Sequence, residues 1–310
     1  MFELFTGYKR FPYPVPLRSK LTNVIRYIFK MPLLEKFLIS QLTNGNKEWW
    51  KKFIPPLYFY SPGSIRYVVR DNIHYRLDVS TFLDHAIFFC QMNEDPAHHN
   101  LFKVLKHDSV VFDIGANVGY LTLNFARTCS HGHVYSFEPD TQNREALLTN
   151  IKLNTFQNIN TYKVALGSQR GKASLYKYYP GNPGTNRILN EKPITKHTVE
   201  EVNVITLDNF VDEEKISKVD LIKVDVEGFE KFVIEGARKV ISKWKPVLFV
   251  ELVEFNVNQQ GYTCASLVEF IESFGYEVKD ATTMSAVDKS KKNHNTDILC
   301  FHKDAGTSPY

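Results

Sequence analysis

The chain has 310 residues, enough for two domains or for one large domain with an appendage, and 43% of them are hydrophobic and 23% charged. These values are typical of a globular protein and exclude a disordered chain, and 15 glycines and 14 prolines are too few for a fibrous one. The net charge of +4 is unevenly distributed, because residues 1–60 contain 10 lysines and arginines but only 3 acidic residues. The rest of the chain is therefore slightly acidic.

Residues 1–60 also contain 14 of the 42 aromatic residues. One interpretation is an accessory segment whose aromatic rings pack on the main domain beneath the stems of its Lys and Arg side chains. The other is a peripheral contact with a membrane surface, for which Trp49-Trp50-Lys51-Lys52 is the best candidate. We expect no membrane-spanning helix, because charges and a proline interrupt the apolar stretch 21–42.

The sequence also favours a cytoplasmic location. Its first residues lack the uninterrupted apolar region of a signal peptide. The four cysteines form neither a metal-binding pair nor a dense disulfide framework, so we expect reduced thiols at Cys90, Cys129, Cys264 and Cys300.

The middle of the chain changes from an antiparallel to a parallel pattern. Two short alternating runs around Asp71-Asn72 predict a β-hairpin over 65–80, and a linking helix is expected over 81–105. From residue 109, short apolar runs alternate with helical patterns, as in parallel βαβ units. The expected strands are 110–114, 134–137, 159–165, 219–224, 247–250, 276–279 and 297–302, and the expected helices are 120–129, 143–154, 229–242 and 265–274.

These elements predict an α/β fold, with a Rossmann-like sheet of about seven strands, helices on both faces and a mostly helical N-terminal extension. The predicted domains are 1–64 and 65–310, with a core at 109–302. Strand-like alternation at 173–178 and 202–206 flanks a Pro/Gly-rich segment, 179–186, which predicts a mobile loop. A loop at this place is suited to a lid or to substrate recognition, and the alternative is a surface insertion without function.

The strongest local motif is the run VVFDIGANVGY at 110–120, a strand that leads into a glycine turn and a helix. Gly115 and Gly119 allow a sharp turn and a close approach of a ligand, and the N–H groups that begin the helix suit a carboxylate or phosphate. A dinucleotide fingerprint would require glycine where the chain has Asn117 and Tyr120, which disfavours NAD. A P-loop is excluded because no Gly-Lys-Ser/Thr follows.

The second strand of the parallel pattern ends at Glu138-Pro139, which places a carboxylate at the carboxyl edge of the sheet. Such a carboxylate can accept hydrogen bonds from both hydroxyls of a ribose. A ribose here and an anionic group at the first turn fit S-adenosylmethionine, whose sulfonium tolerates the nearby Asp113.

Five segments resemble the FkbM-type methyltransferase family in order and spacing, within roughly residues 80–302: 112–120 (FDIGANVGY), 136–139 (SFEP), 164–167 (VALG), 206–208 (TLD) and 222–230 (IKVDVEGFE). The resemblance implies a class I methyltransferase fold that uses S-adenosylmethionine, usually to methylate a hydroxyl of a sugar or a related small molecule. The residues expected to bind this cofactor are Asp113, Gly115, Ala116, Asn117, Gly119, Tyr120, Glu138, Pro139, Ala165 and Asp225.

Methyl transfer is an in-line displacement that depends on alignment, and a sugar hydroxyl also needs a general base or a metal ion. Asp225 and Glu227 flank the end of the fourth strand, and Glu251 ends the fifth. Because parallel strands lie about 4.8 Å apart, these catalytic candidates can converge on one hydroxyl or on one divalent cation, Mg²⁺ or Mn²⁺. The candidate metal ligands are Asp225 and Glu251.

Structural roles are the alternative for several of these residues. Glu227 could cap the helix that starts near Gly228, and Glu251 could pair with a buried lysine. Lys223 lies inside an apolar strand, so we expect an ion pair that steadies one of the acids. The histidines are expected to be surface or capping residues, namely His98, His99 and His294.

The sequence thus predicts an O-methyltransferase that acts on a sugar or glycan precursor. The alternatives are an N-methyltransferase, a methyltransferase for a protein or lipid at a membrane surface, and a nucleotide-binding partner protein without catalysis. We do not expect a nucleic acid substrate, because the main domain is net acidic. The identity of the acceptor and the oligomeric state are left open by the sequence.

Overall fold

The computed structural model describes residues 17–92, 95–177, 183–189 and 198–304. The chain divides into two compact units, Met1–Glu94 and Asp95–Tyr310. This division lies after the predicted hairpin and not before it, so the hairpin belongs to the N-terminal unit.

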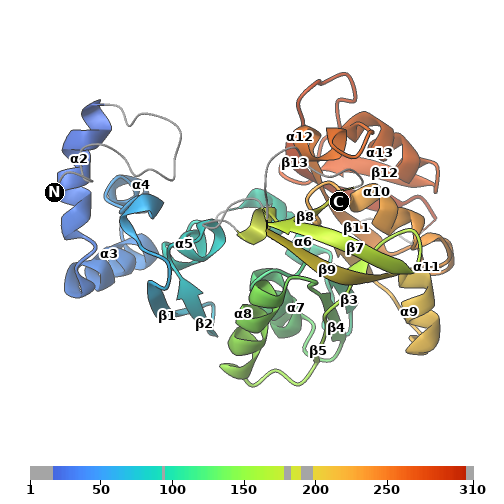
Figure 1. Cartoon of the computed structure of the whole chain (residues 1–310), viewed down its shortest axis with the longest axis horizontal. Helices are drawn as coiled ribbons and strands as arrows, with labels where there is room; N and C mark the ends of the chain where they lie inside the picture. Colours follow the sequence, from blue (N-terminus) through green and yellow to red (C-terminus); the bar gives the residue numbers. More distant parts are fainter. Residues whose placement is uncertain (1–16, 93–94, 178–182, 190–197, 305–310) are drawn as a thin grey trace. The chain divides into compact units, whose positions relative to one another are not determined.

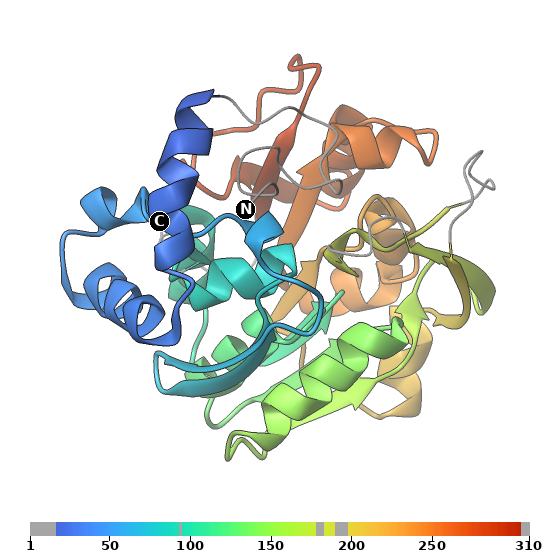
Figure 2. The same cartoon turned by 60° about the vertical axis from the view of Figure 1, so that its left-hand side comes forward.

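From residue 17 to residue 92, the N-terminal unit consists of three helices followed by a hairpin and a fourth helix (Figure 1; blue to teal in Figure 2). Its elements are α2 (Leu17–Ile28), α3 (Pro32–Asn44), α4 (Lys47–Lys51), the 3₁₀ turn η1 (Leu57–Phe59), β1 (Ile65–Arg70), β2 (Ile73–Asp78) and α5 (Phe82–Phe88). The hairpin is confirmed: Arg70 pairs with Ile73, and Asp71 and Asn72 between them have φ of 47° and 63°, as a two-residue turn between twisted strands requires. The mostly helical extension is confirmed as well.

The single helix predicted over 81–105 is wrong. The chain forms α5, which ends at Phe88, and a separate α6 (Pro96–Lys103) in the second unit. Pro96 cannot continue a helix but suits its first turn, and the side chain of Asp95 accepts a hydrogen bond from the N–H of Ala97. The Asp-Pro pair therefore starts a new helix.

The second unit is built on a seven-stranded sheet, as predicted. Its order is β12-β13-β11-β10-β3-β4-β5, and the neighbours are parallel except those of β13, which runs antiparallel to β11 and β12. The strands are β3 (Val110–Ile114), β4 (His133–Phe137), β5 (Ile159–Tyr162), β10 (Leu221–Val224), β11 (Val247–Val253), β12 (Tyr276–Asp280) and β13 (Asn295–His302).

Helices cover both faces of this sheet, because alternate side chains of the central strands point to opposite sides. Phe112, Ile222 and Val250 belong to a core shared with α9, α10, α11 and α13, whereas Leu221 and Phe249 belong to a core shared with α6 and α7. The helices are α7 (Tyr120–Thr128), α8 (Thr141–Lys152), α9 (Leu207–Glu213), α10 (Glu230–Glu235), α11 (Arg238–Trp244), α12 (Glu254–Asn258) and α13 (Cys264–Glu272).

The helix predicted over 229–242 is divided into α10 and α11. Gly236, between them, packs so closely on the backbone that a Cβ there would lie 2.0 Å from the carbonyl oxygen of Gly167. The carboxylate of Asp208 then accepts hydrogen bonds from the N–H groups of Lys239 and Val240, in the first turn of α11. A contact between distant segments thus interrupts the helix.

A second, four-stranded sheet of order β6-β9-β7-β8 is inserted between β5 and β10. It consists of β6 (Ala165–Leu166), β7 (Gly171–Lys177), β8 (Arg187–Ile188) and β9 (Thr198–Ile205), with the 3₁₀ turn η3 (Pro183–Thr185) before β8. The predicted strand 159–165 therefore ends at Tyr162, and Ala165 joins the inserted sheet. The alternation at 173–178 and 202–206 marks β7 and β9, while 179–182 of the predicted mobile loop lie outside the described residues.

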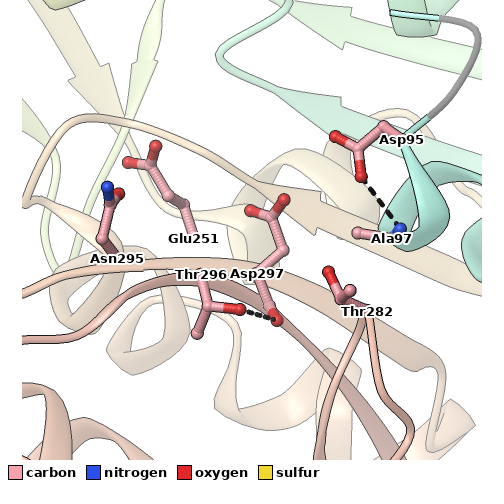
Figure 3. A pocket seen from close by; sticks show the side chains of 7 residues that line it. All are labelled: Asp95, Ala97, Glu251, Thr282, Asn295, Thr296 and Asp297. Atoms are coloured by element: carbon pink, nitrogen blue, oxygen red, sulfur yellow. Dashed lines mark hydrogen bonds between the residues drawn. The ribbon is translucent and has the colours of Figure 1, made fainter. Parts of the chain in front are cut away.

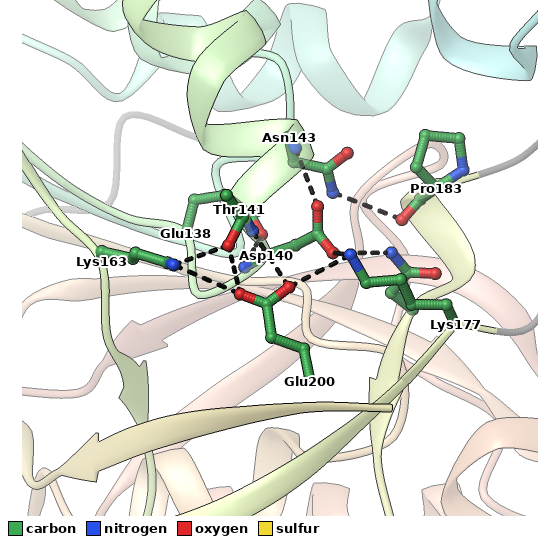
Figure 4. A network of polar contacts seen from close by, with 9 residues as sticks. Glu138, Asp140, Thr141, Asn143, Lys163, Lys177, Pro183 and Glu200 are labelled. Atoms are coloured by element: carbon green, nitrogen blue, oxygen red, sulfur yellow. Dashed lines mark hydrogen bonds and ion pairs between the residues drawn. The ribbon is translucent and has the colours of Figure 1, made fainter. Parts of the chain in front are cut away.

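A network of charged side chains fastens the inserted sheet to the start of α8 (Figure 4). The Lys177 ammonium lies 2.8 Å from a carboxylate oxygen of Asp140 and 3.1 Å from one of Glu200. Glu200 also accepts hydrogen bonds from Thr141 and lies 3.3 Å from Lys163. The insertion is thus held next to the turn that follows β4.

Two further expectations concern the whole chain. Within the described residues, no helix combines the length and hydrophobicity of a membrane-spanning segment. The four cysteines are free thiols, and all of them are buried.

Candidate functional site

The first turn of the site follows β3 and depends on two glycines. Gly115 has φ of 82°, and a Cβ there would lie 1.8 Å from the carbonyl oxygen of Asp225. Gly119 has φ of 92°, and a Cβ there would meet the side chain of Leu147 in α8 at 2.5 Å. Close packing requires glycine at Gly115, which brings the glycine turn against the end of β10, and the positive φ favours glycine at both positions.

Glu138 joins this turn to the end of β4. Its side chain is buried, and its two carboxylate oxygens accept hydrogen bonds from the N–H groups of Asn117 (2.8 Å) and Asp140 (2.9 Å). Burial raises the pKa of Glu138 to about 7, and the two N–H donors partly oppose that rise. The carboxylate is therefore fixed in place at the edge of the sheet where it was predicted.

The other residues predicted at the cofactor surround the same turn or lie on the inserted sheet. Ala116 and Asn117 are within the turn, Tyr120 begins α7, and Pro139 follows β4. Ala165 opens β6 and is buried. Their contacts with a cofactor stay a prediction.

Beneath the turn, a buried ion pair connects β3 and β10. The Lys223 ammonium lies 3.3 Å from a carboxylate oxygen of Asp113 and 3.6 Å from one of Asp225, and it donates a hydrogen bond to the carbonyl oxygen of Gly115 (2.7 Å). Asp113 also accepts a hydrogen bond from the hydroxyl of Thr122 (2.5 Å). The expected structural role of Lys223 is confirmed, and Asp113, which is fully buried, holds the turn from below.

The three catalytic candidates lie together, as predicted from the strand ends. Asp225, Glu227 and Glu251 each offer an oxygen within 4.8 Å of the others. Burial and the charge of Asp225 raise the pKa of Glu227 to about 8, and the same causes raise the pKa of Glu251 well above its usual range. Such a cluster can accept a proton from a hydroxyl or surround a cation.

The turn that carries Asp225 and Glu227 is held by residues behind it. One carboxylate oxygen of Glu230 accepts hydrogen bonds from the N–H groups of Val226 (3.2 Å) and Gly228 (2.9 Å). Gly228 has φ of 102°, and its carbonyl oxygen accepts a hydrogen bond from the Tyr262 hydroxyl (2.8 Å). α10 begins at Glu230 and has no side-chain cap at its start, so the capping role considered for Glu227 is not found.

Two residues that sequence reasoning missed hold Glu227 in place. Asn256 in α12 donates a hydrogen bond to a carboxylate oxygen of Glu227 (2.7 Å), and the Arg187 guanidinium lies 3.6 Å from the same oxygen. Arg187 in turn donates a hydrogen bond to the side-chain oxygen of Asn256 (2.8 Å). The only sequence signal for Arg187 is its place after the Pro/Gly-rich segment, so the inserted sheet reaches the acid cluster through a residue that no motif marks.

The histidines are not part of the acid cluster. The His98 ring is tilted against the nearby rings of Tyr120 and Phe249 and lies 3.8 Å from Asp95, and His99 is exposed. His294 is buried, and its carbonyl oxygen accepts a hydrogen bond from the N–H of Glu254.

Comparison with known proteins places this site in a family. Residues 113–278, more than half of the chain, match the methyltransferase FkbM domain. Methyltransferase 1 of Beauveria bassiana is 29% identical over 42% of this chain, and the match spans 58% of that protein, less than two thirds of its length. The hexuronic acid methyltransferase AglP of Haloferax volcanii is 27% identical over 46% of this chain and 55% of its own length.

A solved structure of an FkbM methyltransferase from Methylobacillus flagellatus is 16% identical, with a TM-score of 0.42, over 71% of this chain and 52% of its own. The residues that match the family include the glycine turn, Glu138 and the acid cluster. This protein therefore belongs to the methyltransferase FkbM family.

Proposed function

We propose that the enzyme transfers the methyl group of S-adenosylmethionine to a hydroxyl of a sugar or glycan precursor. The observation that supports this most is the contact between the glycine turn and the acid cluster. A Cβ at Gly115 would overlap the backbone of Asp225, so the glycine turn and the acid cluster touch. A donor held at the turn and an acceptor held at the acids would then be neighbours, as in-line transfer requires.

The residues present fit S-adenosylmethionine. Each oxygen of Glu138 accepts one backbone N–H, which leaves acceptor capacity on both oxygens for the ribose hydroxyls. The Asp225 side chain is 43% exposed and offers a carboxylate for the ammonium of the methionine part. When bound, this cofactor supplies a methyl group on a sulfonium, whose sulfur leaves as a neutral thioether.

Glu227 is the general base of this proposal. Its proton affinity is raised by burial and by Asp225, and Asn256 orients its carboxylate. Glu227 removes the proton of the acceptor hydroxyl while the oxygen forms a bond to the methyl carbon and the carbon–sulfur bond breaks. A sugar acceptor is supported by the name of the Haloferax volcanii relative and by the many hydrogen-bond acceptors of the cluster.

Glu227→Gln tests this proposal. The variant should lower kcat by about 10²- to 10⁴-fold, because the amide cannot take the proton. Its affinity for S-adenosylmethionine, measured by calorimetry, should stay unchanged. Glu201→Gln, a change of an exposed side chain on β9, is the control and should be fully active. Wild-type kcat in Glu227→Gln would exclude this base.

A divalent cation at the same cluster is a second proposal for the activation step. Asp225 and Glu251 would hold it together with Glu227, and carboxylate oxygens suit Mg²⁺ or Mn²⁺. The cation would supply Lewis acidity that lowers the pKa of the hydroxyl. Activity that EDTA abolishes and Mg²⁺ or Mn²⁺ restores would support it, and full activity after EDTA treatment would exclude it.

We also propose that the N-terminal unit contacts an anionic membrane surface through an aromatic patch, formed by Phe29, Leu33, Phe37, Trp49, Trp50 and Phe53. The patch is continuous: the Trp50 ring lies 5.3 Å from that of Phe37, 6.3 Å from that of Phe29 and 4.6 Å from that of Trp49. Leu33 is 82% exposed, one helical turn before Phe37. Exposed Lys36 and Lys52 flank the patch, which supports lipid headgroups as the occupant.

Co-sedimentation of the full chain with vesicles tests this contact. Vesicles of phosphatidylcholine and phosphatidylserine should bind the chain, and vesicles of phosphatidylcholine alone should bind it less. Leu33→Glu should abolish the binding. Tyr67→Glu changes an exposed aromatic side chain outside the patch, on β1, and should keep it. Equal binding of both variants, or no binding of the wild type, would contradict the proposal.

A further inference from the structure

A polar cavity lies next to the acid cluster, in the second unit (Figure 3). Its volume is about 240 Å³, and it is lined by Asp95, Ala97, Glu251, Thr282, Asn295, Thr296 and Asp297. All of these residues except Ala97 have polar side chains. The cavity is smaller than the roughly 300–1,000 Å³ of pockets for whole drug-sized ligands, so it suits one part of a substrate.

The sheet register explains why carboxylates gather here. Glu251 on β11 pairs directly with Asp297 on the antiparallel β13, so the two side chains project from the same face. Figure 3 shows both side chains on the same side of the strands, and both residues line the cavity. Asp95, at the start of α6, adds a third carboxylate from across the cavity.

The carboxylates that line this cavity differ in their hydrogen-bond partners. Asp95 accepts a hydrogen bond from the N–H of Ala97 and lies 3.8 Å from His98. In contrast, within the part of the chain that the structure describes, no side chain or backbone N–H donates to the carboxylate of Glu251 or Asp297.

The Lys and Arg side chains near the site are paired with other carboxylates. Lys223 lies between Asp113 and Asp225, and Arg187 faces Glu227. Recessed carboxylates are normally paired with a cation or with hydrogen-bond donors. None of the described residues that line the cavity carries a positive charge, so a ligand can supply the cation that its carboxylates would stabilise.

We propose that this cavity binds the protonated amine of the acceptor, so that the substrate is an amino sugar with a free amino group. The inference rests on the proposed function, because the cavity shares Glu251 with the acid cluster. An ammonium has three N–H donors and no acceptor, which matches the carboxylates of Glu251, Asp297 and Asp95. An acylated amine would offer one donor and no charge, and a uronic acid would place a negative charge among these carboxylates.

Binding of monosaccharides to the full chain tests the inference without methyl transfer. Calorimetry or ligand-observed NMR with glucosamine, glucose, N-acetylglucosamine and glucuronic acid at millimolar concentrations should show glucosamine binding about 10- to 100-fold more tightly than glucose, because hydrogen bonds to charged groups are worth about 1.5–3 kcal/mol. Glucuronic acid should bind most weakly. Equal affinity for glucosamine and glucose, or no binding of glucosamine, would overturn the inference.

Asp297→Asn removes one charge with little change in shape. It should weaken glucosamine binding about tenfold and leave the affinities for glucose and S-adenosylmethionine unchanged. Asp288→Asn makes the same charge change on an exposed side chain and should have no effect. Loss of glucose and glucosamine binding together would contradict the amine contact, as would tight binding of Mg²⁺ alone that Asp297→Asn abolishes.

The failure of this inference is distinguishable from that of the proposed function. Selective glucosamine binding without methyl transfer to any sugar would refute the proposed reaction alone. Methyl transfer to neutral sugars without selectivity for the amine would refute the amine contact alone.

Discussion

Lys223 connects the two halves of the site at the level of single residues. Its ammonium faces Asp113 below the glycine turn and Asp225 in the acid cluster, and it also donates to the carbonyl oxygen of Gly115. Neighbouring carboxylates raise its pKa against the opposing effect of burial, so it stays charged. The residue therefore contributes to the fold and to the position of an acid at once.

Lys223→Met should lower the free energy of unfolding by about 3–5 kcal/mol, because it leaves the buried carboxylate of Asp113 without its cation. Urea unfolding followed by circular dichroism measures the change. Lys172→Met is the matched control: its pair with Glu201 is exposed, with both side chains more than 60% accessible, and its loss should cost at most about 1 kcal/mol. Equal losses of unfolding free energy in the two variants would show that burial of the ion pair does not decide its contribution to stability.

The affinity for S-adenosylmethionine should depend on pH through Glu138. The ribose hydroxyls donate to its ionised form, and burial places its pKa at about 7 in the free protein. Affinity should therefore be highest above pH 7 and should fall as pH drops below 7, by up to about tenfold per pH unit. Calorimetry between pH 5.5 and about 8.5 measures this, with Glu138→Gln as the comparison. An unchanged slope in the variant would assign the dependence to another group.

Single residues also show how far the sequence predicts the site. Asp225 and Glu251 follow apolar runs, and the ends of adjacent parallel strands meet at one edge, so their proximity is predictable. Arg187 and Asp297 are not, because each reaches the site through pairing between distant segments, on β8 and on the antiparallel β13. Periodicity carries no information on such pairings.

At the level of elements, the inserted sheet is held to α8 by charge. Lys177 on β7 contacts Asp140, whose other carboxylate oxygen accepts the N–H of Asn143 in the first turn of α8. The same sheet carries Arg187 to the acid cluster. The position of the insertion and the position of Glu227 are therefore coupled through the contacts of Lys177 and Arg187.

Lys177→Met should loosen the insertion without unfolding the second unit. Its loss leaves Asp140 and Glu200 without a shared cation, at a cost of about 1–2 kcal/mol for a half-buried pair. Amide hydrogen exchange in β7 and β9 should accelerate about 5- to 30-fold, while exchange in β3 and β10 stays unchanged. Uniform acceleration across both sheets would indicate global destabilisation and contradict this division.

The predicted elements were correct where local pattern decides and wrong where tertiary contacts do. Short apolar runs identified the strands of the seven-stranded sheet because parallel strands are buried on both faces, as β10 is. The helix over 229–242 was not predicted to break, since the break depends on the approach of Gly236 to Gly167. The Asp95-Pro96 pair, in contrast, is a local signal for the start of a helix. The prediction of a single helix over 81–105 did not take it into account.

At the level of the whole molecule, the chain consists of two compact units with different chemistry. The N-terminal unit contains the basic, aromatic segment, and the second unit contains the family match and the acid cluster. The basic character recognised in the composition therefore belongs to a separate unit. The boundary could not be placed from composition, because the hairpin after residue 64 is neither basic nor part of the family match.

Calorimetry of the full chain should separate the two units. We expect two unfolding transitions, of which only one shifts with S-adenosylmethionine. At a ligand concentration of about 100 times Kd, that transition should gain about 2.7 kcal/mol. A single transition, or an equal shift of both, would show that the units unfold together.

β13 runs antiparallel to both of its neighbours, which sets it apart from the strands that lead to the glycine turn and to Glu138. The glycine turn and Glu138 occupy short strand-to-helix connections whose backbones are in tight contact, so few changes there are tolerated. Asp297 instead follows the segment 281–294, which connects the two antiparallel strands β12 and β13 and is not part of a parallel βαβ connection. Under the proposed function, exchanging this stretch would change which molecule is methylated and would leave the proposed methyl-donor site as it is.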